Sequence, residues 1–192
     1  MRKFRKDKYR VIQWATGSQG KLAIQMAASD TRPHLEVVGC WVHSADKVGM
    51  DAGDLAGIEP IRVKASNDVE ALLAMDADCV IYSPFFADIE LICRILASGK
   101  SVVTQVGDIY IIDKAKRARI QAACAAGSSS YYASGINPGF FSDRLCATLT
   151  TTNSEVEHIR CVEYSHGAPT GLSPHMLFEG IGFGWSQARL DR

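Results

Sequence analysis

The fold is decided by one stretch near the start of the chain, YRVIQWATGSQGKLA (residues 9–23). It opens with a short run of apolar, β-branched and aromatic residues, which predicts a buried strand over Tyr9–Ala15. Gly17 and Gly20 follow, and a helical apolar pattern begins at Lys21. A strand, a glycine turn and a helix in this order are typical of the first part of a βαβ unit.

The same alternation continues to about residue 135. Further strands are predicted at Leu35–His43, Cys79–Ser83, Ser101–Thr104 and Ser129–Ala133, and helices at Lys21–Ser29, Val69–Met75, Ala87–Ser98 and Asp113–Ala126. Gly99 and Gly127 each follow a helical pattern, where a left-handed glycine commonly ends a helix. The pattern predicts an α/β fold, a Rossmann-type doubly wound parallel sheet, with its ligand beyond the carboxyl ends of the strands.

The pattern changes near Pro138. A helical stretch, Ser142–Leu149, leads into a strand-like run, Val156–Tyr164, and then into a glycine-spaced end. We therefore expect a Rossmann domain over residues 1–135. Residues 136–192 should form the beginning of an α+β substrate or dimerisation domain, which we expect to be incomplete.

Composition excludes several classes of protein. The 192 residues are 47% hydrophobic, and 21 Lys and Arg balance 21 Asp and Glu, as in ordinary globular proteins. With no net charge and basic residues concentrated only at the N-terminus, nucleic acid is not an expected partner. No run approaches the length that spans a membrane, so we expect a cytoplasmic protein. The six cysteines form no C-x-x-C pair, which favours buried reduced thiols and no metal site.

The loop Thr16–Gly20 is the candidate phosphate site. Glycines at a strand-to-helix turn let a pyrophosphate approach backbone N–H groups at the helix N-terminus, although a purely structural turn would use the same residues. The second strand ends without the carboxylate that would bind the ribose of NAD. Instead His43, Ser44 and Lys47 could hold an additional phosphate, which favours NADP over NAD, unless they are only solvated loop residues.

Several motifs together resemble one enzyme family. The Gly-x-x-Gly turn, the stretch DAGDLAG at 51–57, the pair Ser83-Pro84 and the stretch SGKSVVT at 98–104 look like the N-terminal domain of the dihydrodipicolinate reductase family. WATG at 14–17, WVHS at 41–44 and GINPGF at 135–140 resemble more closely the branch that includes 2,4-diaminopentanoate dehydrogenase. The similarity covers roughly residues 8 to 185.

The resemblance implies an NAD(P)-dependent oxidoreductase that acts on a carbon–nitrogen bond of a small amine or imine, in amino acid metabolism, and that forms a homo-oligomer. Its carried-over site residues are Gly17, Ser18, Gln19 and Gly20 for the pyrophosphate, with Ser83 and Pro84 on the path to the nicotinamide. Thr104 through Gly107 would approach the nicotinamide, and Asn137 and Pro138 would lie at the interdomain hinge.

One departure from the family bears on the reaction. The His/Lys motif of the dihydrodipicolinate reductases has no counterpart, because no lysine follows Lys116. This argues against dihydrodipicolinate reduction, although a related imine reductase stays open as an alternative. No catalytic acid or base is identified, since His166 is as readily explained as a solvated loop residue. A cofactor-binding remnant or sensor without catalysis is the other alternative.

Overall fold

The computed structural model describes residues 6–107, 110–137, 139–164, 176–180 and 182–191. The chain divides into two compact units, Met1–Thr152 and Asn153–Arg192. We describe each unit by itself. The domain boundary expected at residue 135 stays a prediction.

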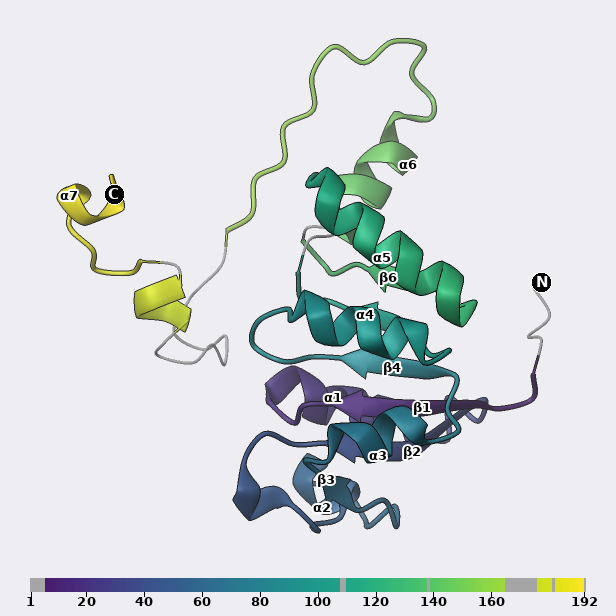
Figure 1. Ribbon diagram of the computed structural model, residues 1–192. Coiled ribbons are helices and arrows are strands. Elements are labelled where there is room, and N and C mark those ends of the chain that lie inside the picture. The colour runs from purple at the N-terminus through teal and green to yellow at the C-terminus, as the bar shows by residue number, and fades with distance from the viewer. Residues whose placement is uncertain (1–5, 108–109, 138, 165–175, 181, 192) are drawn as a thin grey trace. The chain divides into compact units, whose positions relative to one another are not determined.

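The first unit is built on a six-stranded parallel sheet (Figure 1). Its strands are β1 (Tyr9–Trp14), β2 (Leu35–Trp41), β3 (Ala65–Ser66), β4 (Cys79–Tyr82), β5 (Ser101–Thr104) and β6 (Tyr131–Ala133). They lie in the order β3-β2-β1-β4-β5-β6. This order reverses direction at β1, so the predicted Rossmann-type doubly wound sheet is confirmed. The short strand β3 was not predicted, because two residues carry no readable alternation.

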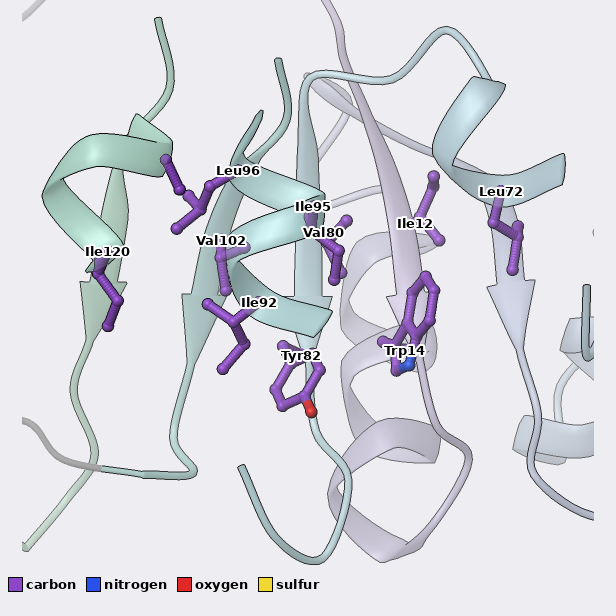
Figure 2. Close-up of a cluster of buried hydrophobic side chains, with 11 residues drawn as sticks. Ile12, Trp14, Leu72, Val80, Tyr82, Ile92, Ile95, Leu96, Val102 and Ile120 are labelled. Atoms are coloured by element: carbon purple, nitrogen blue, oxygen red, sulfur yellow. The ribbon is translucent and has the colours of Figure 1, made fainter. Parts of the chain in front are cut away.

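Helices cover the two faces of this sheet. They are α1 (Ser18–Ala27), α2 (Ala52–Ala56), α3 (Val69–Ala74), α4 (Ile89–Ala97) and α5 (Lys114–Gly127), with a single 3-10 turn, η1 (Ala45–Lys47). One core cluster joins α3, α4 and α5 to β1, β4 and β5, and Figure 2 shows its side chains meeting between the strands and α4. The second cluster joins α1 and α2 to β2 and β3. Each strand is therefore packed as a parallel sheet requires.

Four of these helices begin at an aspartate. Asp51, Asp68, Asp88 and Asp113 cap α2, α3, α4 and α5, and each side chain accepts a hydrogen bond from a backbone N–H of the first turn. Such caps occupy donors that a helix cannot satisfy internally. Helix α1 is different, because it begins at Gly17 and has no side-chain cap.

Gly127 differs from the expectation. Gly99 has the predicted left-handed backbone, with φ of 89°, but at the end of α5 it is Ser128 that is left-handed, with φ of 50°. Gly127 is the last helical residue, and a Cβ placed there would lie 1.9 Å from the Leu96 carbonyl oxygen. Glycine is required at this position because α5 and the end of α4 approach each other closely, and not because of its backbone angles.

The segment after β6 is helical, as predicted, but its first part is a π-helix, which is wider than an α-helix. Residues Phe140–Leu145 form a π-helix, η2, and Cys146–Thr150 continue as α6. None of the helices in the described parts of the chain combines the length and apolar composition needed to cross a bilayer.

In the second unit the predicted strand Val156–Tyr164 is wrong. These residues are exposed and have no regular secondary structure, and no described strand pairs with them. A β-strand needs a neighbour for its backbone hydrogen bonds, which an alternating sequence cannot supply alone. The unit contains a π-helical turn, η3 (Met176–Gly180), and a short helix, α7 (Gln187–Leu190). Its Cys161 is exposed, against the expectation of buried thiols.

The Asp51 cap provides a test of this packing. Burial acts to raise the pKa of Asp51, but hydrogen bonds from the Ile61 and Gly53 N–H groups, at 2.9 and 2.8 Å, lower it overall. The carboxylate therefore stabilises the fold above its unfolded pKa of about 3.9, and this contribution is lost as pH falls through the lower folded value. Asp51→Asn keeps a side chain that can cap the helix but replaces charge-assisted hydrogen bonds by neutral ones, so it should reduce the free energy of unfolding by about 1 kcal/mol at neutral pH, measured by chemical denaturation.

The difference between wild type and Asp51→Asn should shrink as the pH is lowered below about 4, because Asp51 is then protonated first in the unfolded chain and, at lower pH, in the folded chain as well. Asp54→Asn, at an exposed position of the same helix, serves as the control and should change stability by less than about 0.5 kcal/mol. A loss in Asp51→Asn that stays constant down to acid pH would show that the charge is not responsible.

Candidate functional site

The candidate site lies at the carboxyl ends of the parallel strands. In a sheet of this order the two halves diverge between β1 and β4, and ligands bind in the crevice outside that point. The loops after β1, β2, β4, β5 and β6, which carry the predicted site residues, all leave this edge of the sheet.

The turn from β1 into α1 is tightly built. Ala15 has φ of 76°, a left-handed backbone that is unusual for alanine, and its carbonyl oxygen accepts a hydrogen bond from Gln13 Nε2 at 2.9 Å. Gly20 packs directly on that carbonyl, where a Cβ would lie 2.1 Å from the oxygen. Gly17 is exposed, has φ of −71°, and has nothing within 4 Å of the place of a Cβ. The fold itself therefore requires Gly20, whereas Gly17 leaves open space.

The N-terminus of α1 has free backbone N–H donors beside the open space at Gly17. The first backbone bond of the helix runs from Lys21 N–H to the Gly17 carbonyl at 2.9 Å, so the N–H groups of Ser18, Gln19 and Gly20 precede it. No side chain caps them, and no acidic residue lies in the first turn. The helix dipole adds partial positive charge at this end. The arrangement can bind an anion such as a phosphate.

The loop after β2 reaches the same place. Lys47 Nζ donates to Thr16 Oγ1 at 3.5 Å, which brings an ammonium group beside the Thr16–Gly20 loop. Thr16 is buried, whereas His43 and Ser44 are exposed, with the His43 ring centroid 6.1 Å from that of Trp41. The structure therefore brings together the two loops that the sequence placed 31 residues apart.

An aromatic cavity lies beside these loops and was not predicted. Trp14, Trp41 and Tyr82 are in register at the ends of β1, β2 and β4, and they line a cavity of about 400 Å³ together with Pro84 and Phe86. The two indoles stack with centroids 5.3 Å apart and planes 10° from parallel. Figure 2 shows Trp14 and Tyr82 side by side on the α4 face. The available signal was one tryptophan near the end of each of the predicted strands Tyr9–Ala15 and Leu35–His43.

Both indole N–H groups in this cavity are unused. Trp14 Nε1 and Trp41 Nε1 are buried and have no hydrogen-bond partner in the described part of the chain. Such enclosed donors have essentially no accessible surface, so what the cavity offers a ligand is the aromatic and apolar surface of its lining. The cavity can therefore accept a planar apolar group.

Polar residues connect the ends of β4 and β5. Ser83 is buried, and its hydroxyl donates to Gln105 Oε1 at 3.5 Å. Thr104 is 1% exposed, and its hydroxyl is shared between the Tyr82 carbonyl at 2.8 Å and the turn at Val106. The Thr104 side chain thus holds the two strands together. In the turn after β5, the Gln105 side chain is exposed.

The remaining predicted residues lie further along the same edge. Gly107 has φ of 100° and is exposed, and a Cβ there would lie 3.0 Å from the Ala87 Cβ. Asn137 is exposed in the turn after β6. Pro138 and His166 lie outside the described residues. Within the described ranges, no group of three or more acidic, cysteine or histidine side chains could hold a metal ion.

A charged cavity of about 600 Å³ lies at the β6 end of this edge. Tyr110, Arg117, Tyr132, Asp143 and Arg144 line it, from the loop before α5, from α5, from β6 and from η2. No sequence pattern predicts this cavity, because its residues come from four separate segments and match no spacing motif.

Comparison with known proteins identifies relatives over most of the chain. Amine dehydrogenase from Streptomyces virginiae is 32% identical over 167 residues, which are 79% of this chain and 44% of that protein. The 4-hydroxy-tetrahydrodipicolinate reductase of Synechococcus elongatus is 36% identical over 66 residues, covering 34% of this chain and 23% of the reductase. No protein-family model matches the chain.

Solved structures show the same fold. Amine dehydrogenase from Mycobacterium smegmatis superimposes with a TM-score of 0.67 at 20% identity, over 77% of this chain and 45% of that one. Biliverdin reductase from Synechocystis, solved with biliverdin and NADP+, gives 0.50 at 18% identity, over 67% and 38% of the two chains. The chain thus spans less than half the length of these relatives, and its sequence is homologous to amine dehydrogenase and, over a shorter stretch, to 4-hydroxy-tetrahydrodipicolinate reductase.

Proposed function

We propose that this chain binds a nicotinamide dinucleotide and supplies the cofactor-binding part of an oxidoreductase that acts on a carbon–nitrogen bond. The observation that carries the proposal is the uncapped N-terminus of α1 beside Gly17, at the reversal point of the sheet. Homology to amine dehydrogenase supports amine oxidation or imine reduction. The motifs around Trp14 and Trp41 favour a substrate of the 2,4-diaminopentanoate type.

Each part of the cofactor has matching residues. The N–H groups of Ser18, Gln19 and Gly20 would bind the pyrophosphate, and the aromatic cavity at the stacked indoles would take the planar base. Ser83 and Pro84 would then line the path from this cavity to the nicotinamide, which Gln105 and Gly107 would face. The nicotinamide supplies or accepts the hydride, and the chain's own residues bind and orient it.

The loop after β2 supports NADP in preference to NAD. No carboxylate ends β2, where one would repel an additional phosphate on the ribose. The Lys47 ammonium lies beside Thr16, and the exposed Ser44 and His43 side chains add donors nearby. An ammonium group and a hydroxyl at this place bind a phosphate more favourably than they bind two ribose hydroxyls.

Three further expectations belong to the same proposal. We propose that residues 136–192 begin a substrate domain, that the protein associates into a homo-oligomer, and that it works in the cytoplasm. Support for the first comes from the homologous amine dehydrogenases, which are more than twice as long as the matched part. Sedimentation of the purified chain tests the second.

Gly17→Asp separates folding from cofactor binding. Aspartate is a favoured N-cap and meets no neighbour there, so the free energy of unfolding should stay the same or increase by about a few tenths of a kcal/mol. The carboxylate should repel a pyrophosphate and weaken NADPH binding at least tenfold relative to Gly17→Asn, a neutral cap of the same shape. Binding is measured by nicotinamide fluorescence. Equal NADPH affinity in the two variants would contradict the phosphate site.

Gly20→Ala, unlike Gly17→Asp, should destabilise the fold itself. Its Cβ would overlap the Ala15 carbonyl, so the variant should lose about 1–3 kcal/mol of folding free energy even without cofactor. Chemical denaturation of the cofactor-free chain measures this loss. If Gly20→Ala were as stable as wild type, the close packing of α1 on the turn would be wrong.

Lys47→Gln tests the choice of dinucleotide. We expect NADPH affinity to fall about tenfold, because a charge-assisted hydrogen bond is lost, while NADH affinity changes little. Lys8→Gln removes the same charge at the amino end of β1 and should leave both affinities unchanged. An equal loss for NADH and NADPH would instead show that Lys47 contacts a part that both cofactors share.

Turnover is tested with NADP+ and a panel of small primary amines. Oxidation transfers a hydride from the amine carbon to the nicotinamide, and water then replaces nitrogen, so NADPH and ammonia should appear in equal amounts. Absorbance and an ammonia assay follow the two products. Cofactor binding without any such reaction would favour a binding module over an enzyme.

A further inference from the structure

Helices α4 and α5 lie side by side on one face of the sheet (Figure 1). Toward their N-terminal ends, Arg119 forms a salt bridge with Glu90. At their C-terminal ends, Gly127 packs on the Leu96 carbonyl oxygen, where a Cβ would lie 1.9 Å away. Ser129 Oγ donates to the same oxygen at 2.8 Å. The two helices therefore run in the same direction, and their backbones approach each other very closely at the C-terminal contact.

One cysteine on each helix lies one turn before this close contact. Cys93 precedes Leu96 by three residues, and Cys124 precedes Gly127 by three. Residues three apart share one face of a helix, so both cysteines lie on the faces that the two helices turn toward each other. Both side chains also pack against the same buried core cluster. The fold thus brings together two thiols from different crossover helices.

The ionisation of Cys93 shows the same proximity. Burial raises the pKa of the Cys93 thiol against the opposing effect of Arg119, and the neighbouring Glu90 and Cys124 add to the rise. Two thiolates repel each other appreciably only at short range. Both cysteines are half-buried free thiols, so a small reagent can reach them from solvent.

We propose that Cys93 and Cys124 are a redox-active pair that forms a disulfide between α4 and α5 on reaction with a small disulfide oxidant such as glutathione disulfide. One thiolate attacks the S–S bond of the oxidant, which forms a mixed disulfide and releases one glutathione thiol. The second thiolate attacks the protein sulfur of that mixed disulfide and releases the other glutathione thiol. The protein loses two electrons and two protons, and the oxidant takes them up. This modification site is separate from the cofactor site and does not depend on it.

The packing of the two helices suits this bond. A disulfide requires Cα atoms within about 7 Å and Cβ atoms that face each other. Gly127 lets the helices approach closely enough for facing residues one turn away to meet that requirement. The thiols of Cys40 and Cys79 should not compete, because burial raises their pKa values to about 12 and about 11 and leaves little reactive thiolate.

The test treats the reduced, folded full chain with excess glutathione disulfide. Peptide mapping without reductant should find the α4 and α5 peptides joined through Cys93 and Cys124. The bond connects two helices across about 30 residues of chain, so Tm should rise by about 5 °C or more and return to its starting value when a reductant is added. Cys161→Ser is the matched control, because it removes an exposed thiol in the second unit and should form the same bond with the same rise in Tm.

Two variants and an unfolded sample complete the design. Cys93→Ser and Cys124→Ser should each leave the remaining cysteine as a glutathione adduct and lose the rise in Tm. Oxidation in denaturant should give a mixture of cysteine pairings, whereas the folded chain should give one.

Three results with wild type would overturn the proposal. They are glutathione adducts on both Cys93 and Cys124 without a bond between them, no reaction of either while Cys161 is fully modified, and the same mixture of pairings from the folded chain as from the unfolded one. Because the map of wild-type peptides decides between these results, a destabilised serine variant does not prevent a decision.

Discussion

The close approach of α1 to the end of β1 is the constraint on which the rest of the site depends. Gly20 leaves no room for a side chain against the Ala15 carbonyl, and that carbonyl is held by the buried Gln13 amide. At this contact Ala15 has a left-handed backbone, and α1 begins at Ser18, after a turn of only three residues. Because β1 is paired with both β2 and β4, the same turn sets where the neighbouring loops meet it.

Helix capping distinguishes the helix ends that are closed by a side chain from the one that is open to a ligand. Asp51, Asp68, Asp88 and Asp113 each place a carboxylate on the first turn of a helix, which satisfies donors and neutralises part of the dipole. A carboxylate at the start of α1 would occupy the place of an anionic ligand and repel it. Glycine at position 17 keeps that end both open and positive, and it costs only about a few tenths of a kcal/mol relative to a capping side chain.

The carboxyl edge of the sheet changes in character along its length. Near β1, β2 and β4 it is aromatic, with stacked indoles and unused N–H donors. At β4 and β5 the hydroxyls of Ser83 and Thr104 tie the strands together. Past β6 it is charged, with Arg117 and Arg144 fixed by neutral acceptors. An elongated ligand with an aromatic end and a reactive end would find a different chemical environment at each.

The sequence by itself determined the sheet, the order of its elements and the first loop, because a period of two or of 3.6 residues and a glycine turn are local properties. It also placed Thr16–Gly20 and Lys47 at one edge. It could not show that Gly127 is required by the Leu96 carbonyl, or that Trp14 and Trp41 stack, since these contacts join distant segments. The alternation at Val156–Tyr164 was misleading because a strand exists only with a partner. Only the tertiary structure brought Arg117, Asp143 and Arg144 around one cavity, through the packing of α5 and η2 beside β6.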